Sequence, residues 1–358
     1  MNEFGVYLHI PFCASKCDYC AFATWTDRAH LVDRYLAAMS TEIRRAVDAG
    51  LPVADTIFVG GGTPTLVPPD ALAELIGTIP RRDDAEVTVE CNPDDVTADM
   101  LRTYRSGGVN RVSIGVQSMS PHVLAALGRT HDPANVERAV AAVGEAEMPT
   151  FNLDVIYGAA GESVADWRRT VEEVLALGPP HVSAYGLTVE AGTVLAAQPE
   201  RYPDDDDQAD KYEIADDLFA AAGLLNYEVS NWARPGHESR HNFLYWRQAD
   251  YRGFGCAAHS HHDGRRWWNV RTPDRYIDLI TTGKPAESAA EVLDDEGRRV
   301  EGLQLMLRTR DGVARDSFDD ATLDLLDGML LPHPDDANRV VLTRSGRLMA
   351  NEVSVRLK

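Results

Sequence analysis

Six short runs of apolar residues recur through the first half of the chain, with longer mixed stretches between them. Runs rich in Val and Ile with few polar interruptions are typical of strands in parallel sheets that are covered on both sides. We therefore expect each run to form a strand buried on both faces. The runs are residues 5–10, 56–60, 87–91, 111–117, 151–158 and 181–189.

The stretches between these runs have the periodicity and the end signals of amphipathic helices. Residues 27–49 stop before Gly50, as a helix does at a glycine cap. Ser163 begins and Gly178 follows another such stretch. Strand and helix alternate six times, which predicts parallel strands joined by helical crossovers. An open doubly wound sheet and an incomplete barrel both fit this alternation. Further helices are expected at 97–106, 133–147 and 163–177.

The pattern changes after about residue 200. The acidic run Asp204–Asp207 precedes a helix expected at 208–222, where carboxylates at the N-terminus favour the helix. Residues 226–270 are rich in aromatic residues and histidine. Residues 295–358 predict two helices, a strand at VVLT and a terminal strand over 349–357. We therefore expect the chain to end in a small helical unit with a β wing.

Composition and charge narrow the class of protein. Apolar residues make up 44% of the 358, which is typical of a globular chain. No apolar run reaches the roughly 18 residues of a membrane span, and the N-terminus does not resemble a signal peptide, so we expect a cytoplasmic protein. Lys plus Arg number 35 against 56 Asp plus Glu, giving a net charge of −21. This charge repels phosphate polyanions, so nucleic acid is not an expected partner.

Three of the five cysteines lie close together, at Cys13, Cys17 and Cys20. They follow Pro11 and the first predicted strand, at the strand end where α/β folds gather active sites. Three thiolates can hold a 4Fe–4S cluster and leave one iron open. The spacing also suits zinc with His9 as the fourth ligand, or a redox pair at Cys17 and Cys20. An odd cysteine count without an export signal argues against a disulfide scaffold.

The segment CASKCDYC, residues 13–20, resembles the C-x-x-x-C-x-x-C signature of the radical S-adenosylmethionine superfamily. This resemblance implies an α/β fold in the form of a six-unit partial (β/α)6 barrel, which agrees with the six strand–helix units. It implies that the open iron of the 4Fe–4S cluster binds the amino and carboxylate groups of S-adenosylmethionine. It also implies that an electron from the cluster cleaves the sulfonium to a 5′-deoxyadenosyl radical.

The segment GGGTPT, residues 60–65, follows the second predicted strand. Taken alone, three glycines indicate a tight turn, although they also let a backbone approach a ligand closely. The segment resembles the superfamily motif that receives the methionyl ammonium of S-adenosylmethionine, which gives that role to Gly61, Gly62 and Thr63. Other polar residues near the strand ends are singly typical of satisfied core groups or caps. Together they resemble the cofactor contacts of coproporphyrinogen-oxidase-like radical S-adenosylmethionine proteins. These residues are Tyr7, Glu90, Gln117, Arg129 and Asp154.

Segments from nearly the whole chain resemble the oxygen-independent coproporphyrinogen III oxidase group, which has two branches. True oxidases carry a fourth cysteine two residues after the third, where this chain has Phe22. They also have a long N-terminal extension, whereas Cys13 lies almost at the start here. Both differences favour the haem-chaperone branch, the HemW type, whose members bind haem and deliver it to respiratory proteins. The segments are YLHIPFC, GGGTPT, IGVQS, LDVIYG, YGLTVE, YEVSNWARPG, HNFLYW and YRGFGCAAHS.

The segment HNFLYW, residues 241–246, resembles the H-N-x-x-Y-W motif associated with haem in this branch. An imidazole can ligate haem iron, and Tyr and Trp can flank a porphyrin face. His241, Tyr245 and Trp246 are therefore candidate haem contacts. The alternative is that His241 is a hydrogen-bonded loop residue and both aromatic residues belong to the core. Three further histidines compete for the iron: His259, His261 and His262.

The resulting hypothesis divides the chain into a radical S-adenosylmethionine core domain, residues 1–235, and a C-terminal domain, residues 236–358, over its open side. The expected function is that of a haem chaperone without coproporphyrinogen oxidase activity. Its partners are haem and haem-accepting respiratory proteins, with the membrane surface as a place of transfer. The alternative is radical decarboxylation of coproporphyrinogen III, while charge disfavours tRNA modification. Cys91 is expected in the core, and Cys256 is either core or a thiolate ligand.

Overall fold

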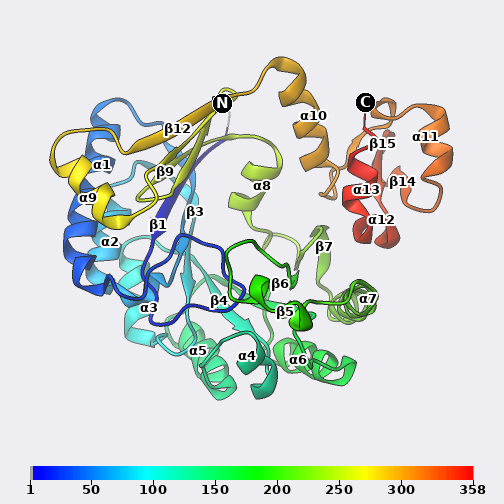
Figure 1. Ribbon diagram of the computed structural model, residues 1–358, viewed down its shortest axis with the longest axis horizontal. Helices are drawn as coiled ribbons and strands as arrows, with labels where there is room; N and C mark the ends of the chain where they lie inside the picture. The colour runs from blue at the N-terminus through cyan, green and yellow to red at the C-terminus, as the bar shows by residue number, and fades with distance from the viewer. Residues whose placement is uncertain (1–2, 358) are drawn as a thin grey trace.

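A mixed sheet of twelve strands organises the computed structural model, which describes residues 3–357. Six of its seven parallel strands stand side by side in chain order (Figure 1). A doubly wound sheet would reverse this order at a switch point, so the arrangement is that of an incomplete barrel. The expected α/β class is confirmed. The six strands are β1 (Phe4–Ile10), β2 (Ala54–Gly61), β3 (Arg81–Cys91), β4 (Arg111–Gln117), β5 (Thr150–Tyr157) and β6 (His181–Gly186).

Helices follow the parallel strands and lie outside the sheet in Figure 1. The helix starts predicted at Thr97 and Ser163 are confirmed, since each side chain accepts a hydrogen bond from a first-turn amide. The helix predicted over 208–222 begins earlier, at Asp205, because Asp204 caps it in the same way. Within residues 3–357, no helix is both long and apolar enough to cross a membrane. The helices are α1 (Val32–Asp48), α2 (Pro69–Gly77), α3 (Ala98–Ser106), α4 (Pro121–Ala126), α5 (Pro133–Glu145), α6 (Val164–Ala176) and α7 (Asp205–Ala221). Short 3-10 helices are η1 (Ala29–Leu31), η2 (Pro64–Leu66), η3 (Leu195–Ala197), η4 (Pro199–Arg201) and η5 (Arg315–Ser317).

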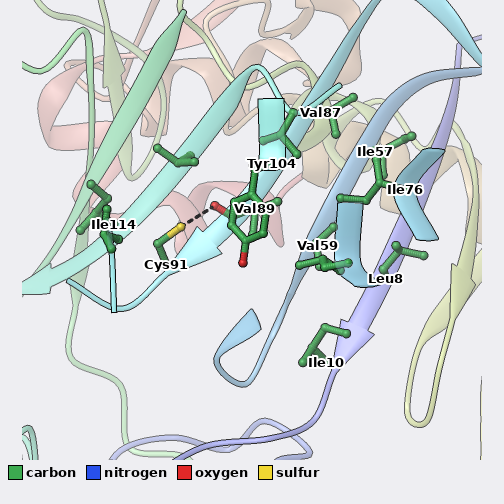
Figure 2. Close-up of a cluster of buried hydrophobic side chains, with 14 of the residues drawn as sticks. Leu8, Ile10, Ile57, Val59, Ile76, Val87, Val89, Cys91, Tyr104 and Ile114 are labelled. Atoms are coloured by element: carbon green, nitrogen blue, oxygen red, sulfur yellow. Dashed lines mark hydrogen bonds between the residues drawn. The ribbon is translucent and has the colours of Figure 1, made fainter. Parts of the chain in front are cut away.

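Alternate residues of the parallel strands face two different environments. Val6, Leu8 and Ile10 of β1 are fully buried in the hydrophobic core beneath the helices. Figure 2 shows Leu8 and Ile10 with apolar residues of neighbouring strands and of helices α2 and α3. Because side chains alternate along a strand, Tyr7 and His9 point to the opposite, concave face. The strands are buried as expected, but their concave face is largely polar rather than apolar.

The sheet continues past the six parallel strands at both edges. At one edge, β9 (Asp250–Phe254) pairs in parallel with β1 and is followed by β10 (His259–His262), β11 (Arg265–Asn269) and β12 (Glu287–Val292). At the other edge, β8 (Asn231–Ala233) pairs with β6, and β7 (Leu225–Glu228) pairs with β8. Strands on both sides of residue 235 thus share one sheet, and the predicted domain boundary there stays a prediction. Between the edges, α8 (Arg240–Trp246) packs against β1 and β2 (Figure 1).

The last part of the chain has its own sheet and hydrophobic cluster, near the C-terminus in Figure 1. The strand predicted over 349–357 is wrong, because residues 350–354 form a helix. Ala350 and Val353, three positions apart, both enter the cluster, which is helical rather than strand spacing. The elements after β11 are α9 (Pro273–Thr281), β12, α10 (Asp295–Met306), β13 (Val313–Ala314), α11 (Asp320–Leu325), β14 (Leu330–His333), β15 (Asp336–Leu342), α12 (Arg344–Leu348) and α13 (Ala350–Ser354).

Glu228, at the end of β7, is a buried carboxyl group at the contact between the sheet and the C-terminal part. It accepts hydrogen bonds from the Asn231 side chain and from the Ser230 amide, and it forms a β-bridge with Thr309. Burial raises the pKa of Glu228 from its usual 4.5 to about 7. The unfolded chain therefore releases this proton at lower pH than the folded chain does.

We predict that Glu228 lowers the free energy of unfolding as pH rises. Its contribution is fully present below pH 4.5 and is lost as pH rises to about 7, a change of about 3 kcal/mol at most. Glu228→Gln does not titrate, so the wild type should lose stability relative to this variant across that range. Urea unfolding at both pH values measures the difference, with exposed Glu200→Gln as the control. Parallel pH profiles for wild type and Glu228→Gln would contradict the prediction.

Candidate functional site

The cysteine loop begins directly after β1, at the carboxyl end of the parallel strands. Two backbone hydrogen bonds close it, from the Cys13 amide to the Trp25 carbonyl at 3.1 Å and from the Trp25 amide to the Pro11 carbonyl at 2.8 Å. A third, from the Cys20 amide to the Cys17 carbonyl at 3.2 Å, turns the chain between the last two cysteines. All three thiols are partly exposed and free of disulfides. The loop therefore holds three accessible thiols at one strand end.

Two hydrogen-bond donors, one from the segment after β2 and one from the segment after α4, point at these sulfur atoms. The Thr63 hydroxyl lies 3.7 Å from Cys13 Sγ, and Arg129 Nη1 lies 3.6 Å from Cys17 Sγ. Burial raises the pKa of the Cys13 and Cys20 thiols. Thiolate ligands of a metal centre are stabilised by such donors, and the positive charge of Arg129 adds to this. The donor set thus fits thiolates that carry a cluster.

The zinc alternative finds less support in the geometry. His9 already uses both ring nitrogens, Nδ1 with the Tyr7 hydroxyl at 3.1 Å and Nε2 with the Ala23 carbonyl at 2.9 Å. Within residues 3–357, no three His, Cys, Asp or Glu side chains are grouped so that they could hold one metal ion. A cubane binds each thiolate to a different iron, so its ligands stand farther apart than those of a single zinc ion.

The glycine segment after β2 lies directly against the cysteine loop. The Gly62 amide donates to the Ile10 carbonyl at 2.7 Å, and the Thr63 amide donates to the Phe12 carbonyl at 2.8 Å. A Cβ atom at Gly62 would lie 2.6 Å from the Phe12 carbonyl oxygen, which is too close. Gly61 has φ +110°, and a Cβ there would lie 2.4 Å from the His9 ring. Both positions therefore require glycine.

The remaining predicted cofactor contacts gather around the same strand ends. Glu90 accepts a hydrogen bond from the Gly61 amide at 3.1 Å, and burial together with Asp154 raises the pKa of Glu90 to about 7. Gln117 ends β4 with φ +63°, and Arg129 Nη2 donates to the Gly115 carbonyl at 3.0 Å. The structure thus brings together residues from β2, β3 and β4 and from the segment after α4. The Arg129 Nε is buried with no hydrogen-bond partner.

A polar network on the concave face was not predicted. Asn152 Nδ2 donates to Ser113 at 2.6 Å and to Asp154 at 2.7 Å, while Asn152 Oδ1 lies 2.6 Å from the His181 ring. Burial raises the pKa of Asp154. Arg111, one concave-facing position before Ser113 on β4, is 2% exposed, and its Nε has no hydrogen-bond partner. Polar residues at alternate positions of the predicted strands were the signal for this network.

His241 lies on α8 inside the barrel and is only 1% exposed. Its Nδ1 lies 2.7 Å from the Thr56 hydroxyl, and its Nε2 lies 2.8 Å from the Tyr245 hydroxyl. The ring also stacks on Phe58, with centroids 5.3 Å apart. Burial lowers the pKa of His241 to about 3, so the ring is neutral. Both of its nitrogens are engaged inside the protein.

Tyr245 and Trp246 of HNFLYW are half-buried. Tyr245 meets Tyr251 of β9 edge to face, with ring centroids 4.9 Å apart. The Trp246 indole Nε1 is buried without a hydrogen-bond partner. An unpartnered indole N–H is costly unless something accepts its proton, so this motif has one donor to offer a ligand.

The other two cysteines lie in apolar surroundings away from the loop. Cys91 is buried in the core, and its thiol points to the Val89 carbonyl at 3.6 Å (Figure 2). Cys256 is fully buried beside the Tyr35 hydroxyl, and burial raises its pKa to about 12. Both thiols are enclosed in the core, unlike the three partly exposed thiols of the cysteine loop, so neither is accessible to a metal centre.

Comparison with known proteins agrees with this geometry. Residues 7–174 match the radical SAM superfamily. The chain is 41% identical to a Mycobacterium tuberculosis protein named Heme chaperone HemW, over 98% of this chain and 94% of that protein. It is 35% identical to a protein of the same name from Bacillus subtilis, over 98% and 97% of the two chains.

A solved structure of similar fold is that of coproporphyrinogen III oxidase (HemN) from Escherichia coli, described as a radical SAM enzyme. Its TM-score is 0.84 at 22% sequence identity, covering 99% of this chain and 89% of that one. At that identity the likeness concerns the fold. The alignments with the two HemW proteins span nearly the full length of both chains and include the cysteine loop. This chain therefore belongs to the radical SAM superfamily and, within it, to the HemW family.

Proposed function

We propose that this protein is a haem chaperone of the cytoplasm that carries a 4Fe–4S cluster and S-adenosylmethionine. The observation that carries this proposal is the sequence similarity, over nearly the full length of the chain, to proteins named as haem chaperones. The cysteine loop supports it, since the position of the oxidase's fourth cysteine holds Phe22, which is 65% exposed and cannot ligate iron. The acceptors of the haem are proposed to be respiratory proteins, with transfer at the membrane surface.

Cys13, Cys17 and Cys20 would hold the cluster by their thiolates. Thr63 would donate a hydrogen bond to the first sulfur and Arg129 to the second, which offsets part of their negative charge. When bound, the cluster and S-adenosylmethionine supply one-electron reductive cleavage of a sulfonium. The residues around them would fix their positions.

The glycine segment and the concave strand ends would hold S-adenosylmethionine. Gly61 and Gly62 keep the backbone of this segment close against His9 and the cysteine loop, where a side chain would not fit, so their backbone groups would face the cofactor. Glu90 and Asp154 would accept hydrogen bonds from its ammonium and hydroxyl groups, and the unpartnered Arg129 Nε would donate to its carboxylate. Tyr7 and Gln117 complete this proposed set, with Tyr7 stacked near Phe58 at a centroid distance of 6.3 Å.

Haem is proposed to lie on the concave face next to α8. Tyr245 and Trp246 of HNFLYW provide aromatic surface, and Trp246 Nε1 is free to donate a hydrogen bond to a carboxylate. His241 holds Tyr245 in place by the hydrogen bond between its Nε2 and the Tyr245 hydroxyl. The acidic net charge of −21 disfavours nucleic acid as an alternative partner.

We predict that anaerobic reconstitution loads about four irons per chain, because a cubane contains four. Replacing Cys13, Cys17 or Cys20 by Ala should remove the iron and the broad visible absorption. Cys91→Ala and Cys256→Ala are the matched controls and should keep both, because these thiols lie in the core. Iron analysis and absorption spectra measure this. Tight zinc binding without an iron–sulfur spectrum would contradict it.

We predict that Gly62→Val weakens the response of the reduced cluster to S-adenosylmethionine. The added side chain would collide with the Phe12 and Ile10 carbonyl oxygens, which separates the glycine segment from the cysteine loop. Overpacking of this kind costs about 1–3 kcal/mol of stability. Gly77→Val is the control, since a Cβ atom at Gly77 meets nothing within 4 Å. The electron paramagnetic resonance spectrum measures the response, and equal responses in both variants would be contrary evidence.

We predict that the protein retains about one haem per chain after desalting and does not convert coproporphyrinogen III. Burial of the macrocycle against aromatic side chains supplies much of the affinity. The Soret band should differ from that of free haem, and anaerobic assays should detect no protoporphyrinogen. Phe22→Cys alone should not create oxidase activity. Efficient decarboxylation with no haem retention would favour the oxidase alternative instead.

A further inference from the structure

The proposed haem function leaves open which side chain binds the iron. Three of the four histidines considered for this role are already engaged. His241 bonds through both ring nitrogens. His261 is buried, with Nδ1 on the Ala249 carbonyl at 3.0 Å and Nε2 accepting from the Gly264 amide at 3.2 Å. His262 is exposed and pairs with Asp250 at 2.9 Å.

His259, at the start of β10, differs from these three. It is exposed, and no residue among 3–357 forms a hydrogen bond with its ring nitrogens. An imidazole with a free nitrogen lone pair is the usual protein ligand of haem iron. Partial burial of its ring, with the nearby Arg266 adding to it, lowers the pKa of His259, which favours the neutral form that binds metals.

The alternation of β10 and β11 places His259 on the concave face. On β11, the ring of Trp267 contacts the guanidinium of Arg252. That guanidinium also pairs with Glu42 of helix α1, so Arg252 and Trp267 both face the outer side of the sheet. The next residue, Trp268, therefore points inward, and His259 is its partner across the two strands. His261, two residues on, contacts Tyr251, which in turn contacts Tyr245 of α8. His259 thus shares a face with the aromatic residues proposed to contact haem.

Trp268 limits the orientations that the His259 ring can take. The two rings stack with centroids 5.6 Å apart and an angle of 26° between their planes. A ring stacked on the imidazole face supports it without occupying the lone pair of a ring nitrogen, which lies in the plane of the imidazole. Orientation by a neighbouring group is how proteins hold metal-binding histidines.

We propose that His259 is the protein ligand of the haem iron and that Trp268 is the positioning residue that holds its ring. This inference rests on the proposed haem-chaperone function. The coordinate bond forms between a ring nitrogen of neutral His259 and the iron, with no proton or electron exchanged. His241 then acts beneath the site, by fixing Tyr245 rather than by binding iron.

The test compares Soret spectra of the full-length, cluster-reconstituted protein loaded with haem. His259→Ala should move the Soret maximum, and added free imidazole should restore it. Trp268→Ala should keep the maximum but weaken haem affinity about 10-fold, as loss of a positioning partner does. His262→Ala is the matched control, an exposed histidine on the same strand with its side chain on the other face, and should change neither.

The outcomes separate the two proposals. If His241→Ala moves the Soret maximum and His259→Ala does not, this inference is overturned while haem binding stands. The same holds if neither variant moves it, because the ligand is then not one of these imidazoles. If the wild-type protein retains no haem, the proposed function fails first. Because His259 is exposed, His259→Ala should leave the unfolding midpoint unchanged, which excludes misfolding as the cause of a shift.

Discussion

The alternation of side chains along the six parallel strands is the constraint on which the candidate site depends. One set of positions, such as Val6, Leu8 and Ile10, is buried under the helices. Each such side chain contributes about 1.5–3 kcal/mol by its burial. A slip of one residue would turn this set inward and drive Tyr7 and His9 into the apolar core. The hydrophobic side of the sheet therefore fixes the register that presents the chemical groups on the other side.

Burying polar groups on the concave face costs free energy, and the hydrogen bonds of its network offset that cost. Asn152 bonds to Ser113, Asp154 and His181, so most buried polar atoms there have partners. Two guanidinium nitrogens, Nε of Arg111 and Nε of Arg129, are left without any. An unpartnered buried donor favours whatever acceptor can reach it. The same face that is stabilised by internal hydrogen bonds thus keeps unused donors for anionic groups of a ligand.

Sequence patterns predicted the local features of this fold better than the distant ones. The six strands, the capped helices and the position of the cysteine loop depend on short segments, and the structure has them where expected. The pairing of β9 with β1 joins segments about 245 residues apart, which no local pattern indicates. The sequence does not indicate a polar concave face, because apolar residues dominate each run. The sequence pattern predicts a strand where helix α13 lies, because only Ala350 and Val353 distinguish helical spacing from strand spacing.

The histidines show what a motif resemblance can and cannot give. HNFLYW supplies suitable residue types, but whether an imidazole can bind iron depends on its lone pairs, and the structure ties both His241 nitrogens to Thr56 and Tyr245. The position of His259 follows from the β9–β11 extension, which was not predicted. That extension is paired to β1, the strand that leads into the cysteine loop. Burial lowers the pKa of His9 to about 4, and a positive charge on His259 would lower it further. The proposed haem face and the cysteine loop are therefore carried by the same paired strands, β1 and β9. A ligand bound at one of them changes the surroundings of the other.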